Sequence, residues 1–335
     1  MKGTIYIDKS LSVFYTLSSI LDIGMEDKMA LLDTEDFLSQ TGKAMVGVAR
    51  LLLHYSKGEK LPRMVDIAHK LKSGNGTIQE AFNHLTKLGA IAVEAHGARG
   101  SYLAEIDYPM LWRYAGNEWI IGSMPLPYAL RYEGLATALY AQLAASGLPF
   151  NMTYQRGALS RGEMVRKDHF HYAVMSLLAA EHFSSLHPKI SIITRLPMGS
   201  YASEHVLISR VPRDQIRRIG VDKTSLDVML LTDDEFQGEH NLEKVPVTGA
   251  QILNLLQEGL FDAIIWNRDG IQAVPDNVML IPLRGDVHKR EMATQAVIIA
   301  LQDTPVRQVL LSIFSPEQIT FIQQEVLSRQ RLPRY

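Results

Sequence analysis

The sequence predicts an α/β protein of two parts: an N-terminal helix-turn-helix with a β-hairpin, and two C-terminal lobes of alternating strands and helices. Residues 58–103 show the first pattern, two short amphipathic helices around a glycine-containing turn and then two strands. From residue 119 onward, short apolar strands alternate with helices, and two long connections divide them into two sets. A chain of 335 residues, 47% hydrophobic and 21% charged, is large enough for two or three soluble domains.

The helix-turn-helix is expected at residues 63–71 and 77–88, preceded by a first helix at 43–55. The two helices can pack through apolar positions, namely Val65, Ile67, Ala68 and Leu71 on the first and Ile78, Ala81, Leu85 and Leu88 on the second. The residues that this packing turns outward are Gln79, Glu80, Asn83 and Lys87. A polar second helix of this kind is the one that enters the major groove of DNA.

The ends of the second helix and the strands after it complete this module. Asn75 is expected to cap the helix through its side-chain oxygen, and Gly89 to end it in the left-handed conformation. Residues 90–94 and 100–104 flank a turn, which predicts a hairpin with Arg99 near its tip. The alternative is a helical subdomain that binds no nucleic acid, because helix-turn-helix geometry also occurs in such proteins.

Charge is distributed unevenly along the chain. The formal net charge is −2, yet residues 41–101 hold nine Lys or Arg against four Asp or Glu. Residues 1–40 hold three Lys against seven Asp or Glu. A local basic patch attracts phosphate whatever the net charge of the whole protein. The excess of five positive charges is modest, so tight DNA binding would need two copies of the module.

The same segment resembles the winged helix of GntR-type regulators. The residues that carry the resemblance are Gly58, Leu61, Pro62, 66–68, 77–81, Leu85, Leu88 and Gly89. That family usually has Ser-Arg before the Thr and an Arg two residues after it, where this chain has Asn75-Gly76 and Gln79. Operator sequence and affinity therefore do not carry over. The residues expected to contact DNA are Lys60, Arg63, Asn75, Gly76, Thr77, Gln79, Asn83 and Arg99.

The second part is expected to contain open parallel sheets, because its strands and helices alternate. Strands are expected at 119–123, 150–154, 171–176, 190–194, 204–209, 217–221, 245–247, 262–266, 278–281 and 296–300. Helices are expected at 132–146 and 177–183 and, as a pair, at the end of the chain. The domains are then a helical or dimerisation segment (1–40), the winged helix-turn-helix (41–104), a linker (105–118) and a bilobed domain (119–330).

Residues 119–330 resemble the effector domain of YhfZ-type regulators, which is similar to type 2 periplasmic binding proteins. The residues that carry this resemblance are 121–128, 133–136, 172–180 and 262–267. The resemblance implies a bilobed type 2 periplasmic-binding-protein-like fold and a sensor role, and it supplies no ligand.

Candidate ligand-binding residues follow from the rule that ligands bind at the carboxyl ends of strands in open sheets. That rule selects Ser123, Met124, Pro125, Ser176, Ser200, Tyr201, Thr224, Ser225, Asn267 and Arg268. Each Ser or Thr could instead be only a helix cap, but their recurrence at five strand ends favours a cleft. Arg131, Arg195 and above all Arg268 are candidates to hold a carboxylate or phosphate, the alternative being a salt bridge.

Other kinds of site find little support. The chain has no cysteine, which removes disulfides and Cys-ligated zinc. His169 and His171 alternate along a strand but lack a recognisable third ligand, so no metal site is expected. No catalytic triad or phosphate-binding loop occurs in the required context. Glu163 with Asp168, and residues 233–235, are expected to be solvated acids, and Met124 and Met198 to line the cleft.

Together these features predict a ligand-responsive transcriptional regulator that binds double-stranded DNA and senses a small polar metabolite, expected to be anionic, without a cofactor. Homodimerisation, with residues 10–55 as a candidate surface, would match paired half-sites. No run of about 18 apolar residues or N-terminal leader is found, which favours the cytoplasm. The alternatives are an enzyme on a periplasmic-binding-protein-like fold and a small-molecule binding protein without a DNA function.

Overall fold

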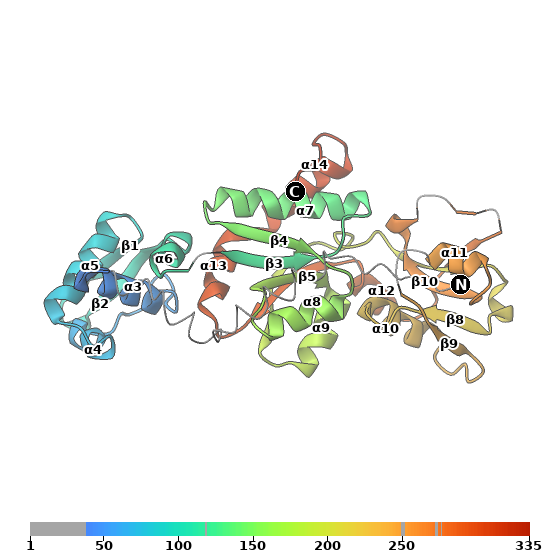
Figure 1. Ribbon diagram of the computed structural model, residues 1–335, viewed down its shortest axis with the longest axis horizontal. Helices are drawn as coiled ribbons and strands as arrows, with labels where there is room; N and C mark the ends of the chain where they lie inside the picture. The colour runs from blue at the N-terminus through green and yellow to red at the C-terminus, as the bar shows by residue number, and fades with distance from the viewer. Residues whose placement is uncertain (1–37, 118, 249–251, 272–273, 276) are drawn as a thin grey trace, which may run out of the picture.

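The computed structural model describes residues 38–335 except 118, 249–251, 272–273 and 276. Figure 1 shows three units in a row along the longest axis: the N-terminal domain, a first lobe and a second lobe. The greater part of the expected segment 1–40, and of the candidate dimer surface at 10–55, lies outside the described residues. Within the remainder of that surface, Ala44, Val48, Ala49, Leu51 and Leu52 are buried in the core of their own domain.

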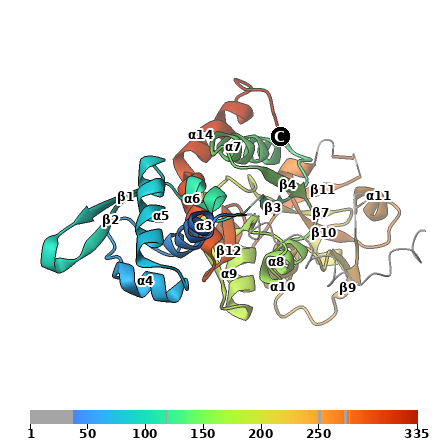
Figure 2. The same ribbon diagram turned by 60° about the vertical axis from the view of Figure 1, so that its left-hand side comes forward.

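The N-terminal domain is a helix-turn-helix followed by a hairpin, as predicted. Its elements are α3 (Gln40–Leu52), α4 (Met64–Lys70), α5 (Asn75–Lys87), β1 (Ile91–Ala95), η2 (Gly97–Arg99) and β2 (Ser101–Ile106). Ser39 begins α3 by accepting a hydrogen bond from the Gly42 amide. The strands β1 and β2 pair antiparallel, and Figure 2 shows the hairpin projecting from the body beside α5.

Two apolar residues expected in the core of this module lie outside it. Val65 on α4 is 59% exposed, and Leu88 just after α5 is 45% exposed. The buried positions of the two helices are Ile67 and Ala68 on α4, and Ile78, Ala81, Phe82 and Leu85 on α5. The contact between the helices is therefore narrower than the apolar pattern predicts.

The ends of α5 differ in how well the sequence predicts them. Asn75 is the first residue of α5, and Gly74 is its cap, without a side-chain hydrogen bond. The expectation that Asn75 caps the helix was therefore wrong by one residue. Gly89 has a φ of +79°, which confirms the left-handed end of the helix.

The expected linker 105–118 is largely structured. It contains the end of β2 and the helix α6 (Tyr108–Tyr114), which Asp107 caps by accepting from the Met110 amide. Leu111 and Trp112 on α6 are buried. The segment is therefore a packed element between the two parts of the chain.

Each lobe is built on a five-stranded sheet with helices on its faces (Figure 1). The first lobe has the strand order β4-β3-β5-β12-β6. Its strands are β3 (Ile120–Met124), β4 (Phe150–Tyr154), β5 (Tyr172–Ser176), β6 (Ile190–Arg195) and β12 (Ala296–Leu301). Its helices are α7 (Leu130–Ala145), α8 (Ala158–Arg166), α9 (Leu177–Leu186), α13 (Pro305–Ile313) and α14 (Pro316–Leu327).

The second lobe repeats this arrangement with the strand order β11-β7-β10-β8-β9. Its strands are β7 (His205–Ser209), β8 (Arg218–Val221), β9 (Glu243–Pro246), β10 (Ala263–Asn267) and β11 (Met279–Pro282). Helices α10 (Leu226–Glu235) and α11 (Ile252–Gln257) and the short turns η3 (Arg213–Gln215) and η4 (Arg268–Gly270) complete it. Helix α12 (Val287–Met292) lies in the connection that returns to the first lobe.

The sheets are mixed, which corrects the expectation of open parallel sheets. In the first lobe β12 runs antiparallel to β5 and β6, and in the second lobe β7 runs antiparallel to β10 and β11. Both strands follow directly on the two long connections between the lobes, β6 to β7 and β11 to β12. The chain enters each of these strands from the other lobe, and this reverses their direction.

Central strands bury both of their faces, which explains their uninterrupted apolar sequences. On β5, Val174 packs into the core shared with the N-terminal domain, whereas Ala173 and Met175 face a second core. That second core also contains Leu207 of β7 and Leu226 of α10, so it extends from one lobe into the other. The two lobes are therefore packed together and not merely tethered.

Candidate DNA-binding surface and ligand cavity

The polar face of α5 is exposed as the sequence predicts. Gln79, Glu80, Asn83 and Lys87 all lie on the solvent side of the helix. The Gln79 side-chain amide donates to the Asn83 side-chain oxygen over 3.2 Å, which orients both amides on one face. An exposed face of paired amides on a second helix has the chemistry that reads base edges.

The other expected DNA contacts lie around α5. Asn75 and Gly76 are exposed at the start of the helix, and Thr77 is half-buried there. Lys60 forms an isolated β-bridge with Tyr102 of β2. Lys60 therefore lies beside the hairpin, whereas Asn75, Gly76 and Thr77 lie at the start of α5.

Two arginines flank the same helix. Arg99 is exposed in the turn η2 at the tip of the hairpin. Arg63 is exposed before α4 and forms an ion pair with Asp66 over 3.0 Å. An exposed pair of this kind is weak, so a phosphate can displace the carboxylate.

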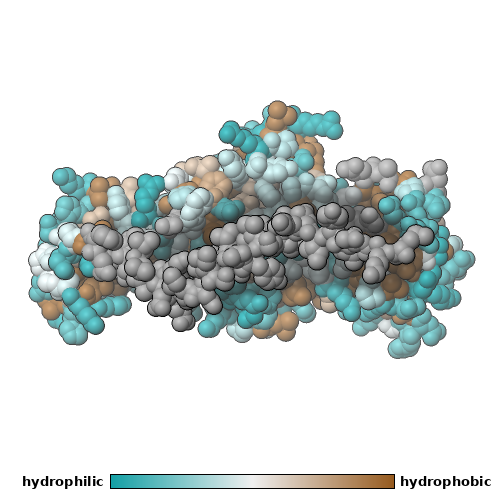
Figure 3. Space-filling view, in the orientation of Figure 1, coloured by the Kyte–Doolittle hydropathy of each residue, from teal (hydrophilic) through white to brown (hydrophobic). Residues whose placement is uncertain are grey.

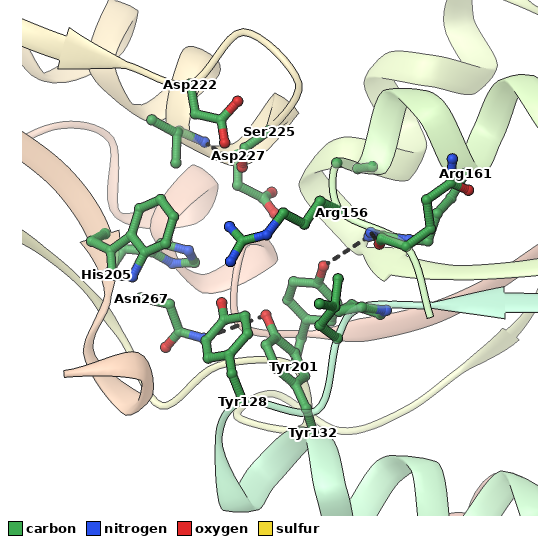
Figure 4. A pocket seen from close by; sticks show the side chains of 17 residues that line it. Tyr128, Tyr132, Arg156, Arg161, Tyr201, His205, Asp222, Ser225, Asp227 and Asn267 are labelled. Atoms are coloured by element: carbon green, nitrogen blue, oxygen red, sulfur yellow. Dashed lines mark hydrogen bonds between the residues drawn. The ribbon is translucent and has the colours of Figure 1, made fainter. Parts of the chain in front are cut away.

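A cavity of about 70 Å³ lies between the two lobes (Figure 4). Its lining comes from both: Pro125, Leu126, Tyr128, Tyr132, Gln155, Arg156, Gly157, Ala158, Arg161 and Tyr201 from the first lobe and its connection, and His205, Asp222, Ser225, Asp227, Val228, Trp266 and Asn267 from the second. At roughly 10–15 Å³ for each water, this volume holds roughly five to seven water-sized groups. The cavity thus suits a small ligand while the lobes are together.

The lobes are in direct contact around this cavity. Ser176 donates a hydrogen bond to Asp227, the Asn267 side chain donates to the Tyr132 hydroxyl over 3.4 Å, and Arg131 pairs with Asp269 over 2.9 Å. Gly157 has a φ of +79°, and a Cβ there would lie 2.8 Å from the Thr224 carbonyl oxygen. Only glycine allows this close approach of the first lobe to the second.

Two arginines line the cavity, and they differ in what they already bind. Arg161 is buried and donates to the carbonyl oxygens of Val174 and Gln155, at 2.9 and 2.7 Å, and to the Tyr201 hydroxyl at 3.2 Å. Arg156 is exposed, and its guanidinium makes no hydrogen bond or ion pair with the described residues. Figure 4 shows Arg156 reaching into the middle of the labelled side chains. Arg156 is therefore the cation available to a ligand.

Two carboxylates of the second lobe line the same cavity. Asp227 is 4% exposed, and burial raises its pKa from its ordinary value to about 6, against the smaller effects of the Ser176 hydrogen bond and of the Arg161 charge. Asp222 is buried and accepts from the amide and hydroxyl of Thr224 through one oxygen, at 2.9 and 2.7 Å. Among the described residues, nothing donates to the second oxygen of either carboxylate.

The remaining polar groups of the lining are uncharged at neutral pH. Tyr128, Tyr132 and Tyr201 form a chain of edge-to-face ring contacts with centroids 5.2 Å apart. Burial raises the pKa of each hydroxyl, that of Tyr201 to about 12, so they stay protonated. Burial also lowers the pKa of His205 to about 4, and its Nδ1 has no partner among the described residues. These groups can exchange hydrogen bonds with a ligand without adding charge.

Four of the predicted ligand-binding residues line the cavity: Pro125, Tyr201, Ser225 and Asn267. Six do not. Ser123 and Met124 are buried inside β3, Ser176 is held by Asp227 behind the lining, and Ser200 accepts from the Ala296 amide. Thr224 donates to Asp222, and Arg268 donates to the Ile271 carbonyl oxygen. Met198 is exposed and is not part of the lining either.

The other arginine candidates have structural roles. Arg131 donates to Asp269 and to the Gly199 carbonyl oxygen, which braces the two lobes. Arg195 pairs with Glu181 on the surface at 3.6 Å. The salt-bridge alternative therefore describes both of these residues.

Two charged residues of the cavity were missed, although the strand-end rule could have found them. Arg156 follows the end of β4 at Tyr154, and Asp222 follows the end of β8 at Val221. The strand-end rule does not select Asp227, which lies on α10. Asp227 reaches the cavity because α10 packs against the first lobe, where it meets Ser176, 51 residues away in sequence.

The acidic run on α10 also differs from expectation. Residues 233–235 were expected to be solvated, but the side chains of Asp234 and Glu235 are buried. Asp234 accepts from the Asp286 amide and Glu235 from the Arg284 amide. These two acids therefore hold the connection that leads to α12.

Helix α6 joins the DNA-binding domain to the first lobe. Its Leu111 and Trp112 belong to one continuous core that runs from Ala44 of α3 to Ile322 of α14. Arg50 of α3 donates to the Ala115 carbonyl oxygen over 2.8 Å, and Arg113 of α6 donates to that of Gly147. The Trp112 ring makes an edge contact with His171, which precedes β5. The helix-turn-helix thus shares a continuous core with the first lobe.

Metal and membrane sites find no support in the described part of the chain. No group of three or more His, Asp or Glu there is placed to hold a metal ion. No helix in the same residues has the length and hydropathy to span a bilayer. Figure 3 shows hydrophilic residues mixed with hydrophobic ones over both ends of the molecule.

Comparisons with known proteins agree with this two-part architecture. Residues 107–335 match the YhfZ C-terminal domain family, and residues 56–103 match a helix-turn-helix domain family. Protein YhfZ of Escherichia coli (strain K12) is 32% identical over 304 residues, which cover 89% of this chain and 99% of that protein.

A solved structure of a YhfZ protein also matches this chain. The crystal structure of YhfZ from Shigella flexneri is 32% identical, has a TM-score of 0.59, and covers 68% of this chain and 98% of its own. The periplasmic aliphatic sulphonate binding protein SsuA from Escherichia coli is 12% identical with a TM-score of 0.47, over 64% of this chain and 75% of its own. The fold is an N-terminal helix-turn-helix joined to a bilobed α/β domain, and the chain belongs to the YhfZ family.

Proposed function

We propose that this protein is a ligand-responsive transcriptional regulator that binds an operator through α5 and the β1-β2 hairpin. The observation that carries the proposal is helix α6, whose Leu111 and Trp112 join the helix-turn-helix to the lobe that forms one wall of a ligand-sized cavity. A ligand that changes how the second lobe sits against the first then acts on a lobe that shares its core with the DNA-binding domain. Such a coupling requires only that the ligand favour one arrangement of the lobes.

The DNA contacts follow from the chemistry of the exposed side chains. Gln79 and Asn83 present side-chain amides that suit adenine edges in the major groove, and Arg99 reaches the backbone or minor groove from the hairpin tip. We expect a GntR-like docking of this winged module, with a second copy on a paired half-site, in the cytoplasm where the DNA is. The residues that complete the proposed surface are Lys60, Arg63, Asn75, Gly76 and Thr77.

The enzyme alternative is less well supported. The charged groups of the cavity are the two arginines and two aspartates described above, and their arrangement suits recognition of charge. A binding protein without a DNA function would leave the exposed amide face of α5 unexplained. The helix-turn-helix favours the regulator over both alternatives.

The test is a gel shift or anisotropy titration of the full-length chain with the duplex that lies upstream of its own gene, against a shuffled duplex of the same length. We expect binding that prefers the upstream duplex by at least tenfold and weakens as salt rises. Equal binding to the two duplexes at physiological salt would contradict a role as a specific regulator.

A further inference from the structure

Opposite charges on opposite walls of the cavity indicate the kind of molecule that it takes. The free cation, Arg156, belongs to the connection between β4 and α8 in the first lobe. The carboxylates, Asp222 and Asp227, belong to the end of β8 and to α10 in the second lobe. Neither carboxylate forms an ion pair with Arg156 in the described part of the chain. The walls thus carry separated charges that no neighbour neutralises by direct contact.

Arg161 does not alter this division. Its guanidinium donates to Val174, Gln155 and Tyr201, so it cannot turn to a ligand without losing buried hydrogen bonds. Its charge acts on Asp227 through space. Since the charge of Arg161 offsets that of Asp227, the charges of the cavity that remain without an opposite partner are those of Arg156 and Asp222.

A simple anion would satisfy only one wall. It would pair with Arg156, but it would also lie in the same small cavity as two carboxylates with unused oxygens, which costs free energy at low dielectric. A simple amine would pair with a carboxylate, but its positive charge would lie in the same cavity as the positive charge of Arg156. A molecule that carries a carboxylate and a protonated amine a few bonds apart satisfies both walls at once.

We propose that the cavity binds a small zwitterion of the amino-acid class, its carboxylate held by Arg156 and its ammonium group by Asp222. This inference rests on the proposed ligand site and names its ligand class. The volume of about 70 Å³ fits a molecule of roughly six non-hydrogen atoms. Apolar atoms of Val228 and Leu126 line the cavity and suit a short side chain. Because its two charged groups bind different lobes, the ligand itself holds the lobes together.

The experiment is a calorimetric titration of the full-length protein with matched probes. Glycine and both enantiomers of alanine and serine are compared with glycolate, lactate and glycerate, which lack the amine, and with ethylamine and ethanolamine, which lack the carboxylate. We expect at least one amino acid to bind, and its hydroxy acid and amine to bind at least tenfold more weakly.

Variants assign the charges. Arg156→Gln and Asp222→Asn should each weaken binding of that amino acid at least tenfold. Two matched controls should leave it unchanged: Arg166→Gln, which removes a surface pair with Glu163, and Asp233→Asn, which removes a surface pair with Lys244.

Two outcomes overturn the zwitterion inference: hydroxy acids that bind as tightly as amino acids, and no binding of any of the probes. Its failure is distinguishable from failure of the proposed function. If a hydroxy acid binds and alters DNA affinity, the regulator proposal stands without the zwitterion. If an amino acid binds and DNA affinity is unaffected, the zwitterion stands without the regulator.

Discussion

Ser176 at the end of β5 in the first lobe donates a hydrogen bond to the carboxylate of Asp227 on α10 in the second lobe. Both residues are buried, so this bond is made only while the lobes are together. Ser176 also caps α9 by accepting from the Ala179 amide over 3.0 Å. One side chain therefore ends a strand, begins a helix and ties the two lobes beside the ligand cavity.

The first prediction concerns the pH dependence that Asp227 gives to stability. Its pKa is about 6 in the folded protein and 3.8 in an unperturbed carboxyl, so the folded protein binds more protons than the unfolded chain between these pH values. The free energy of unfolding of the wild type, relative to Asp227→Asn, should therefore fall as pH rises from about 4 to 6, by on the order of 3 kcal/mol.

Urea denaturation of both proteins at several pH values measures this difference. The low pKa of His205, about 4, gives an opposite trend in the same window, but it is common to the two proteins and cancels to first order in the comparison. Parallel pH profiles for wild type and Asp227→Asn would show that folding does not raise the pKa of Asp227.

The second prediction concerns base recognition by α5. Gln79→Ala and Asn83→Ala should each weaken binding to the upstream duplex by about 1–3 kcal/mol, the contribution of a good base contact, with much less effect on shuffled DNA. Gln324→Ala is the matched control, since Gln324 is an exposed amide on α14 away from the helix-turn-helix. Competition titrations measure the change. Equal losses of affinity on both duplexes would mean that these amides do not read sequence.

The third prediction separates the hairpin from the recognition helix. Arg99→Ala should weaken binding to operator and random duplex by the same factor, because an interaction with phosphate carries no sequence information. The slope of log affinity against log salt should become shallower by about 0.9, the value for a single phosphate. Titrations of both duplexes at several salt concentrations measure the slope. A weakening confined to the operator would assign base reading to Arg99.

The fourth prediction concerns the joint between the domains. Leu111→Ala removes a fully buried side chain of α6 and should lower the free energy of unfolding by about 2–5 kcal/mol. Leu311→Ala, on the neighbouring helix α13, is the matched control, because Leu311 is 37% exposed and should cost much less. Denaturation followed by circular dichroism compares them. Equal effects would indicate that α6 is not an integral part of the core.

The strands could be predicted from sequence because their positions depend on local composition. Strands such as β5 and β12 are buried on both faces, so their apolar runs stand out against the helices between them. Strand direction could not be predicted in the same way. The reversal of β7 and β12 depends on the route of the chain between lobes, which leaves no mark in the composition of either strand.

The sequence predicts a residue of the ligand cavity only where that residue directly follows the end of a strand. Tyr201, Ser225 and Asn267 follow from that rule, whereas the arginine in the cavity is Arg156 and not the expected Arg268. Whether an arginine is free or engaged depends on contacts between distant segments, such as Arg131 with an aspartate 138 residues away. Helix α6 looks like a linker in sequence because its burial comes from α3 and α13, which lie on either side of it along the chain.

The most direct test of the proposed regulation is the DNA affinity of the full-length protein with and without a cavity ligand. Anisotropy titrations with the upstream duplex are run in the absence and presence of the amino acid that binds best, for wild type and for Arg156→Gln. We expect the ligand to change the wild-type dissociation constant by about 5–150-fold, corresponding to about 1–3 kcal/mol of coupling, and to leave that of Arg156→Gln unchanged. A wild-type protein that binds the ligand and holds DNA with the same affinity at every ligand concentration would contradict this expectation.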